Sequence, residues 1–127
     1  MDRYDADHSP DPIAWLAIDE SERIELILDY HRRHDVRTPA PRIHAAIHAV
    51  VENQIAMVNP PVVAETLRRL QQEGLSRHEA VHAIGVLVTA RLAAAVKSET
   101  VESAAVLNAK YEADLGQLTA ESWRQSG

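Results

Sequence analysis

The sequence contains no cysteine among its 127 residues. Disulfide bonds, thiolate zinc sites and cysteine nucleophiles are therefore excluded, so any transition metal must be held by histidine, aspartate or glutamate. Phenylalanine is also absent, and no segment shows the alternation of apolar and polar residues that is typical of a half-buried strand. Alanine, leucine, glutamate, arginine and glutamine are abundant instead, which favours an all-α fold.

The chain also lacks a long apolar run. Its most hydrophobic segment, residues 80–96, is interrupted by His82 and Arg91 and falls short of the roughly 20 residues that span a bilayer. The start, MDRYDADHSPDP, is acidic and has no apolar core of the kind found in secretory signals. A net charge of -6 disfavours general attraction to nucleic acid or to an anionic membrane. We therefore expect a cytoplasmic protein with neither a membrane nor a nucleic acid as partner.

The length and the 46% apolar content suit one hydrophobic core, so we expect a single helical domain over residues 1–127 with loose tails at 1–11 and 119–127. Proline, glycine and capping residues predict a short turn near Pro12 and a compact bundle of about five helices. Gly74 is expected to cap one helix in a left-handed conformation, and Ser76 with Glu79 forms a capping box for the next. The five helices are expected at residues 19–34, 42–58, 60–74, 77–97 and 101–115.

Two stretches of the chain are near copies of each other: IHAAIHAVVENQIA, residues 43–56, and RHEAVHAIGVLVTA, residues 77–90. Their alignment pairs His44 with His78 and His48 with His82, so four of the seven histidines occupy HxxxH frames. Residues four apart lie on one face of a helix, with Cβ atoms about 5–6 Å apart, so each pair can bind one metal ion through two imidazoles. The alanines around them predict that the two Ala-rich HxxxH helices pack closely against each other.

The first HxxxH helix adds a carboxylate, because Glu52 follows His48 by four residues, whereas the second copy has Val86 there. The sequence thus predicts an asymmetric site for one transition-metal ion. Four imidazoles suit zinc, nickel or copper, and the carboxylate adds iron and manganese; we expect zinc or iron. The site could close within one chain or across a homodimer. The predicted ligands are His44, His48, Glu52, His78 and His82.

The number of predicted ligands favours a structural or metal-handling role over catalysis, because four or five protein ligands leave little room for a substrate. His31, which follows the apolar stripe of the first long helix, is a further candidate ligand or the partner of a ligand. The alternative is that these histidines are ordinary residues of amphipathic helices, bonded to one another or to carboxylates. The repeat could then reflect helix packing alone.

The strings HAAIHAVVENQ and HEAVHAIGVL are similar to an uncharacterised bacterial domain-of-unknown-function family of small helical proteins. Members of that family carry an HxxxH motif, then a Glu-Gln element, then a second HxxxH. The resemblance covers about residues 41–90 and includes Glu52 and Gln54. It implies a compact helical fold with histidines that act together, and it supplies no activity.

Two other functions compete with metal binding alone. The string HEAVH matches the HExxH pattern of zinc hydrolases, in which Glu79 would activate water, and Glu102 falls where one branch of those enzymes has a third ligand. Against this, the aligned first copy has Ala45 in place of Glu79. The segment around Gly74 also resembles the pattern of a DNA-binding helix-turn-helix, with two predicted helices joined by a short turn. Its recognition face, however, would carry few basic residues. A metal-free helical interaction module is the remaining alternative.

Overall fold

The computed structural model describes residues 1–97 and 103–126, and all the secondary structure in these ranges is helical. The predicted all-α class is confirmed. The expected number of about five helices is too low, because the turn near Pro12 and the C-terminal tail each form a short helix. The expected start of a helix at Val101 lies outside the described residues. The seven helices are α1 (Pro12–Leu16), α2 (Glu20–Arg33), α3 (Pro41–Met57), α4 (Pro61–Gln72), α5 (Arg77–Lys97), α6 (Ala104–Gln117) and α7 (Ala120–Gln125).

The start of α5 shows how local sequence sets a helix boundary. The Ser76 hydroxyl oxygen accepts a hydrogen bond from the backbone N–H of Glu79 at 3.1 Å, and the Glu79 carboxylate accepts one from the backbone N–H of Ser76 at 3.2 Å. This is the predicted capping box. Gly74 has a φ of 106°, a conformation that favours glycine. It follows the C-cap residue of α4, Glu73, where the chain leaves the helix.

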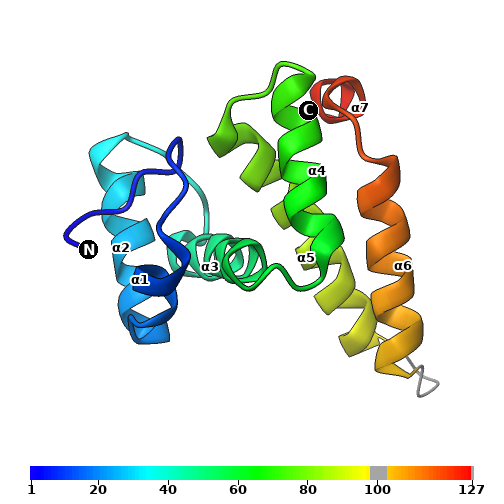
Figure 1. The fold of residues 1–127 in the computed structure, drawn as a ribbon, viewed down its shortest axis with the longest axis horizontal. Coiled ribbons are helices and arrows are strands. Elements are labelled where there is room, and N and C mark those ends of the chain that lie inside the picture. Colours follow the sequence, from blue (N-terminus) through cyan, green and yellow to red (C-terminus); the bar gives the residue numbers. More distant parts are fainter. Residues whose placement is uncertain (98–102, 127) are drawn as a thin grey trace.

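Helix α3 occupies the centre of the molecule and divides the apolar interior into two parts. In Figure 1 it is seen nearly end-on, with α1 and α2 on one side and α4, α5 and α6 on the other. One core joins the N-terminal segment, α1 and α2 to one face of α3, and contains Tyr4, Trp15, Ile27 and Ala49. The second core joins the other face of α3 to α4, α5 and α6, and contains Val51, Leu70, Ile84 and Leu115.

Helices α3 and α5 pack against each other, as their small residues predict. A Cβ atom added at Gly85 would lie 3.2 Å from Cγ2 of Ile47, which is tighter than ordinary van der Waals contact. The missing side chain at Gly85 therefore allows the close approach of the two HxxxH helices.

Parts of both segments that were expected to be loose tails pack against the rest of the described chain. Tyr4 and Ala6 are fully buried, because the N-terminal segment packs over α3 and the start of α5. Thr119 caps α7, whose first residue, Ala120, is buried. Gly127 lies outside the described residues.

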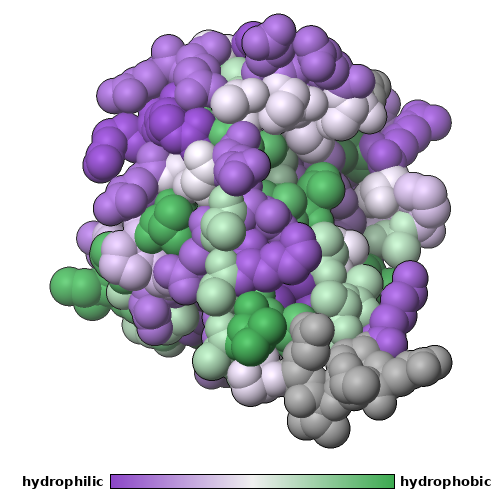
Figure 2. Space-filling view, turned by 90° about the vertical axis from the view of Figure 1, so that its right-hand side faces the viewer, coloured by the Kyte–Doolittle hydropathy of each residue, from purple (hydrophilic) through white to green (hydrophobic). Residues whose placement is uncertain are grey.

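Helix α5 is long and apolar enough, by length and composition, to cross a membrane, but a core helix of a soluble protein passes the same test. Val81, Ile84 and Val88 of α5 lie in the second core, whereas Leu92 and Val96 near its end are exposed. Figure 2 shows the surface of the molecule on the side of α6 and α7. Polar residues cover the upper part of this surface, and apolar residues lie between polar ones below.

Candidate metal centre

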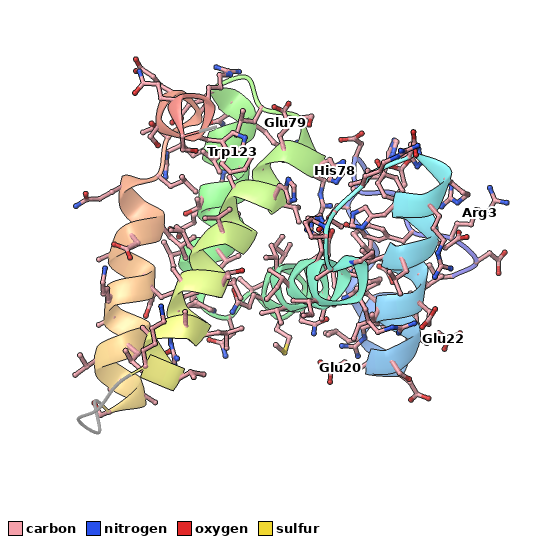
Figure 3. All side chains as sticks on the ribbon, turned by 180° about the vertical axis from the view of Figure 1, so that it is seen from behind. Arg3, Glu20, Glu22, His78, Glu79 and Trp123 are labelled. Carbon is pink, nitrogen blue, oxygen red and sulfur yellow. The ribbon has the colours of Figure 1, made fainter. Side chains whose placement is uncertain are left out.

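Five histidines from three helices meet where the two cores adjoin. His31 comes from α2, His44 and His48 from α3, and His78 and His82 from α5. The ring centroids lie 4.5 Å apart for His44 and His48, 4.6 Å for His44 and His82, 4.8 Å for His31 and His48, and 5.6 Å for His48 and His78. Figure 3 shows His78 at the start of α5, on the side that faces α2 and α3. We call these five residues the histidine cluster.

The cluster brings together all four histidines of the two HxxxH motifs and adds His31. Each HxxxH pair projects from one helical face, and the contact between α3 and α5 sets the two faces opposite each other. The sequence signal for His31 is its position after Ile24, Ile27 and Leu28 on the core-facing stripe of α2. His8 and His34, in contrast, are exposed.

The cluster contains two sets of three imidazoles that could each hold a metal ion. One set is His44, His48 and His82, and the other is His31, His48 and His78. Within each set the candidate ligand nitrogens all lie within 4.8 Å of one another. The Nε2 atoms of His44 and His82 are 3.1 Å apart and share a hydrogen bond. The same distance is close to the spacing of about 3.4 Å that tetrahedral zinc imposes on its ligands through bonds of about 2.0–2.1 Å. Both sets depend on His48.

Several nitrogens of the cluster are buried without a hydrogen-bond partner in the described part of the chain. They are Nδ1 and Nε2 of His31, both ring nitrogens of His48, and Nε2 of His78. His31 and His48 are only 3% and 1% exposed. A buried polar group left unpaired costs about 1–3 kcal/mol, so proteins rarely retain one without reason. A metal ion would give these lone pairs a partner.

Burial also sets the protonation of the cluster. Burial, together with the smaller effect of the neighbouring imidazoles, lowers the pKa of His31 and of His82 to about 4. The pKa of His48 lies far below its ordinary value for the same reasons. Burial also lowers the pKa of His44 and of His78. The imidazoles are therefore neutral at pH 7, which is the form that binds metal.

Glu52, the predicted fifth metal ligand, does not lie in the histidine cluster. Its carboxylate is bonded to Arg77 and Tyr4 instead. Its two carboxylate oxygens accept hydrogen bonds from the Arg77 guanidinium, both at 2.8 Å, and the Tyr4 hydroxyl donates a further one. Arg77 also donates to the backbone carbonyl of Ala6 at 3.0 Å. Glu52 and Arg77 are buried, and we call this group the Tyr4–Glu52–Arg77 network. A carboxylate already paired with a guanidinium is a poor candidate for a fifth ligand, and we leave Glu52 out of the ligand set.

The network also shifts the protonation of its own members. Burial raises the pKa of Tyr4 well above its ordinary value, and the negative charge of Glu52 raises it further. Burial alone would lower the pKa of Arg77, but the hydrogen bonds and charge of Glu52 raise it. Tyr4 is thus a neutral donor and Arg77 a cation at any pH the folded protein meets.

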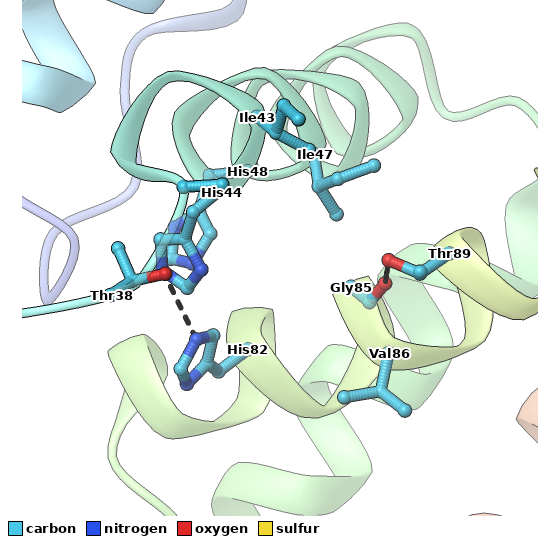
Figure 4. A pocket seen from close by; sticks show the side chains of 10 residues that line it. Thr38, Ile43, His44, Ile47, His48, His82, Gly85, Val86 and Thr89 are labelled. Atoms are coloured by element: carbon cyan, nitrogen blue, oxygen red, sulfur yellow. Dashed lines mark hydrogen bonds between the residues drawn. The ribbon is translucent and has the colours of Figure 1, made fainter.

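A pocket of about 220 Å³ opens beside the first set of histidines. Figure 4 shows His44, His48 and His82 near one end, with Ile47 of α3 reaching toward α5; Ile43 of α3 also lines the pocket. The α5 side is formed by Gly85, Val86 and Thr89. Among the described residues, no acidic or basic side chain other than these histidines lines the pocket.

Comparison with known proteins adds no relative. No protein family, no curated protein and no solved structure matches this chain. The resemblance of residues 41–90 to an uncharacterised bacterial family stays a prediction.

Proposed function

We propose that this protein binds one transition-metal ion, zinc or iron, through His44, His48 and His82. The observation that carries the proposal is the convergence of these three residues: their candidate ligand nitrogens lie within 4.8 Å of one another, and both ring nitrogens of the buried His48 have no hydrogen-bond partner among the described residues. The short distance between the Nε2 atoms of His44 and His82 supports it, as do the lowered pKa values of these histidines. With Glu52 held by Arg77, the ligands are all nitrogen, which suits zinc, copper, nickel and iron and disfavours manganese.

The ion can occupy only one of the two sets fully, because both require His48. We favour the set with His44 and His82 for two reasons. The Nε2 atoms of these residues are already spaced nearly as they would be around a zinc ion, and this set lies beside the pocket. His31 and His78 then pack beside His48, with ring centroids 4.8 Å and 5.6 Å from its ring. We expect His82→Ala to weaken metal binding by more than about 100-fold, and His31→Ala, which removes a packing neighbour of His48 and no ligand, by at most about tenfold. The reverse order would place the ion at His31, His48 and His78.

A structural or metal-handling role fits the site better than hydrolysis. Three protein ligands leave a coordination position toward the pocket, as in catalytic zinc sites. A hydrolase would also need a general base there, but Glu79 is exposed and caps α5. The other residue considered for a hydrolase, Glu102, lies outside the described residues.

The helix-turn-helix alternative is weakened by the burial of its would-be recognition face. Arg77, the main cation of that face, is 5% exposed and bonded to Glu52. The backbone N–H of His78 donates to Asp7 of the N-terminal segment. A phosphate backbone could not reach these groups without unfolding that segment.

Elemental analysis of untagged protein tests the proposal. We expect about one equivalent of zinc or iron per chain in the wild type, or its uptake when either ion is supplied to chelator-treated protein. His48→Leu should hold no stoichiometric metal, because every candidate set requires His48. A folded wild-type protein that takes up neither ion would overturn the proposal.

A further inference from the structure

The pocket beside His44, His48 and His82 combines these histidines with aliphatic side chains, as a binding site for a small ligand would. We infer that it binds a short-chain aliphatic monocarboxylate, whose carboxylate completes the coordination of the metal ion and whose alkyl chain fills the pocket. This inference rests on the proposed function, because without the ion the pocket has no group that would hold the carboxylate.

The charge of the site favours an anionic head group. Three neutral imidazoles would leave the two positive charges of a divalent ion uncompensated. The one buried carboxylate nearby, that of Glu52, is already paired with Arg77. No acidic side chain of the described residues lines the pocket. An ion with uncompensated charge in such surroundings favours an anion from solution, and a carboxylate oxygen is an ordinary zinc or iron ligand.

The walls of the pocket favour an aliphatic chain. Ile43, Ile47 and Val86 supply branched aliphatic surface, and Ile47 packs against Gly85 on the facing helix. The Thr89 hydroxyl is turned away, because it donates to the backbone carbonyl of Gly85 at 3.0 Å (Figure 4). Thr38 offers a hydroxyl near the histidine end, where a carboxylate would lie.

The size and exposure of the pocket limit the chain to a few carbons. Its volume of about 220 Å³ lies below the roughly 300–1,000 Å³ of sites for drug-sized ligands. Ile43 and Val86 are 67% and 53% exposed, so an alkyl chain between them would cover apolar surface that otherwise faces water.

Cobalt(II) provides a direct test, since its visible absorption reports both its binding to histidines and any change in its other ligands. The chelator-treated full chain is loaded with cobalt(II) and titrated with butyrate, acetate or 1-butanol. We expect saturable spectral changes with butyrate and roughly tenfold weaker binding of acetate, which lacks two methylenes that the pocket would bury. We expect no change with 1-butanol, which lacks the anionic head group.

Two variants on the same helix locate the alkyl chain. Val86→Phe fills the pocket and should weaken butyrate binding at least tenfold while leaving cobalt binding and acetate binding intact. Val96→Phe is the matched control, because Val96 is 86% exposed and does not line the pocket, and it should bind butyrate as the wild type does.

The outcomes separate this inference from the proposed function. Cobalt binding without any response to butyrate would overturn the inference and leave metal binding standing. Equal affinities for acetate and butyrate, or full butyrate binding by Val86→Phe, would also overturn the assignment of the pocket to the alkyl chain. If cobalt does not bind the folded chain at all, the proposed function fails and the inference fails with it.

Discussion

The Tyr4–Glu52–Arg77 network and the histidine cluster are neighbours in the interior, and they treat buried polar groups in opposite ways. Glu52 follows His48 by one turn of α3, and Arg77 precedes His78 on α5. In the network both oxygens of Glu52 have partners, and only Nε of Arg77 has none among the described residues. In the cluster, His31 and His48 have no hydrogen-bond partner for either ring nitrogen. The network is completed within the chain, whereas these two histidines have no partner among the described residues, and we propose a metal ion as the partner of the cluster.

The largest effect should come from breaking the network. Glu52→Ala leaves the Arg77 cation buried and unpaired, which should lower the free energy of unfolding by about 3–5 kcal/mol. Urea unfolding followed by circular dichroism measures this loss.

The double variant Glu52→Met with Arg77→Met sharpens the comparison. It should be more stable than Glu52→Ala, because no uncompensated charge stays buried, and it should keep its metal if Glu52 is not a ligand. Loss of metal from this folded double variant would restore Glu52 to the ligand set.

Replacing the central histidine should have the opposite character. His48→Leu removes two unpartnered nitrogens from the interior, so the metal-free variant should be at least as stable as the metal-free wild type. It should forfeit the stabilisation by metal, which amounts to about 2.7 kcal/mol at a free metal concentration 100 times the dissociation constant. Thermal unfolding of both proteins, with and without metal, provides the measurement. A loss of several kcal/mol in the metal-free variant would show that His48 acts chiefly in packing.

Acid should destabilise the metal-free protein through the cluster. The folded pKa of His31 and His82 is about 4, below the ordinary value of 6.5 expected in the unfolded chain. Between these values the unfolded chain binds more protons, so stability is complete above about pH 6.5 and falls as the pH drops toward 4. Urea midpoints across this range should decline, and less steeply when His31 and His82 are replaced by Leu. Equal slopes for the two proteins would contradict the assigned pKa values.

The smallest effect should come from the cap of α5. Glu79→Ala removes one half of the capping box and should cost about 0.5–1 kcal/mol of stability without changing metal content. Peptide hydrolysis by zinc-loaded wild type that this variant abolishes would instead support the HExxH hydrolase.

Local sequence signals predict where the helices lie along the chain better than they predict which side chains of different helices contact each other. The HxxxH pairs, Gly74 and the Ser76–Glu79 box give the correct helical faces and the start of α5, because each depends on residues within one or two turns. The pairing of Glu52 with Arg77 joins residues 25 positions apart, and that of Tyr4 with Glu52 joins residues 48 apart. Spacing along one helix cannot show such contacts.

The candidate site illustrates the same limit. The spacing of His48 and Glu52 correctly predicts that both face the interior, but it could not show that α5 presents histidines to one and arginine to the other. His31 was an additional candidate because it continues an apolar stripe. Its place in the cluster depends on how α2 packs against α3, which no local pattern encodes.

If a metal ion completes the histidine cluster, removing the ion with a chelator should lower the melting temperature of the protein. Wild-type protein supplied with zinc or iron(II) should melt several degrees higher than the same protein after chelation, because the ion binds only the folded cluster. His48→Leu should melt at the same temperature in both conditions. Equal melting temperatures for the wild type with metal and with chelator would contradict the account.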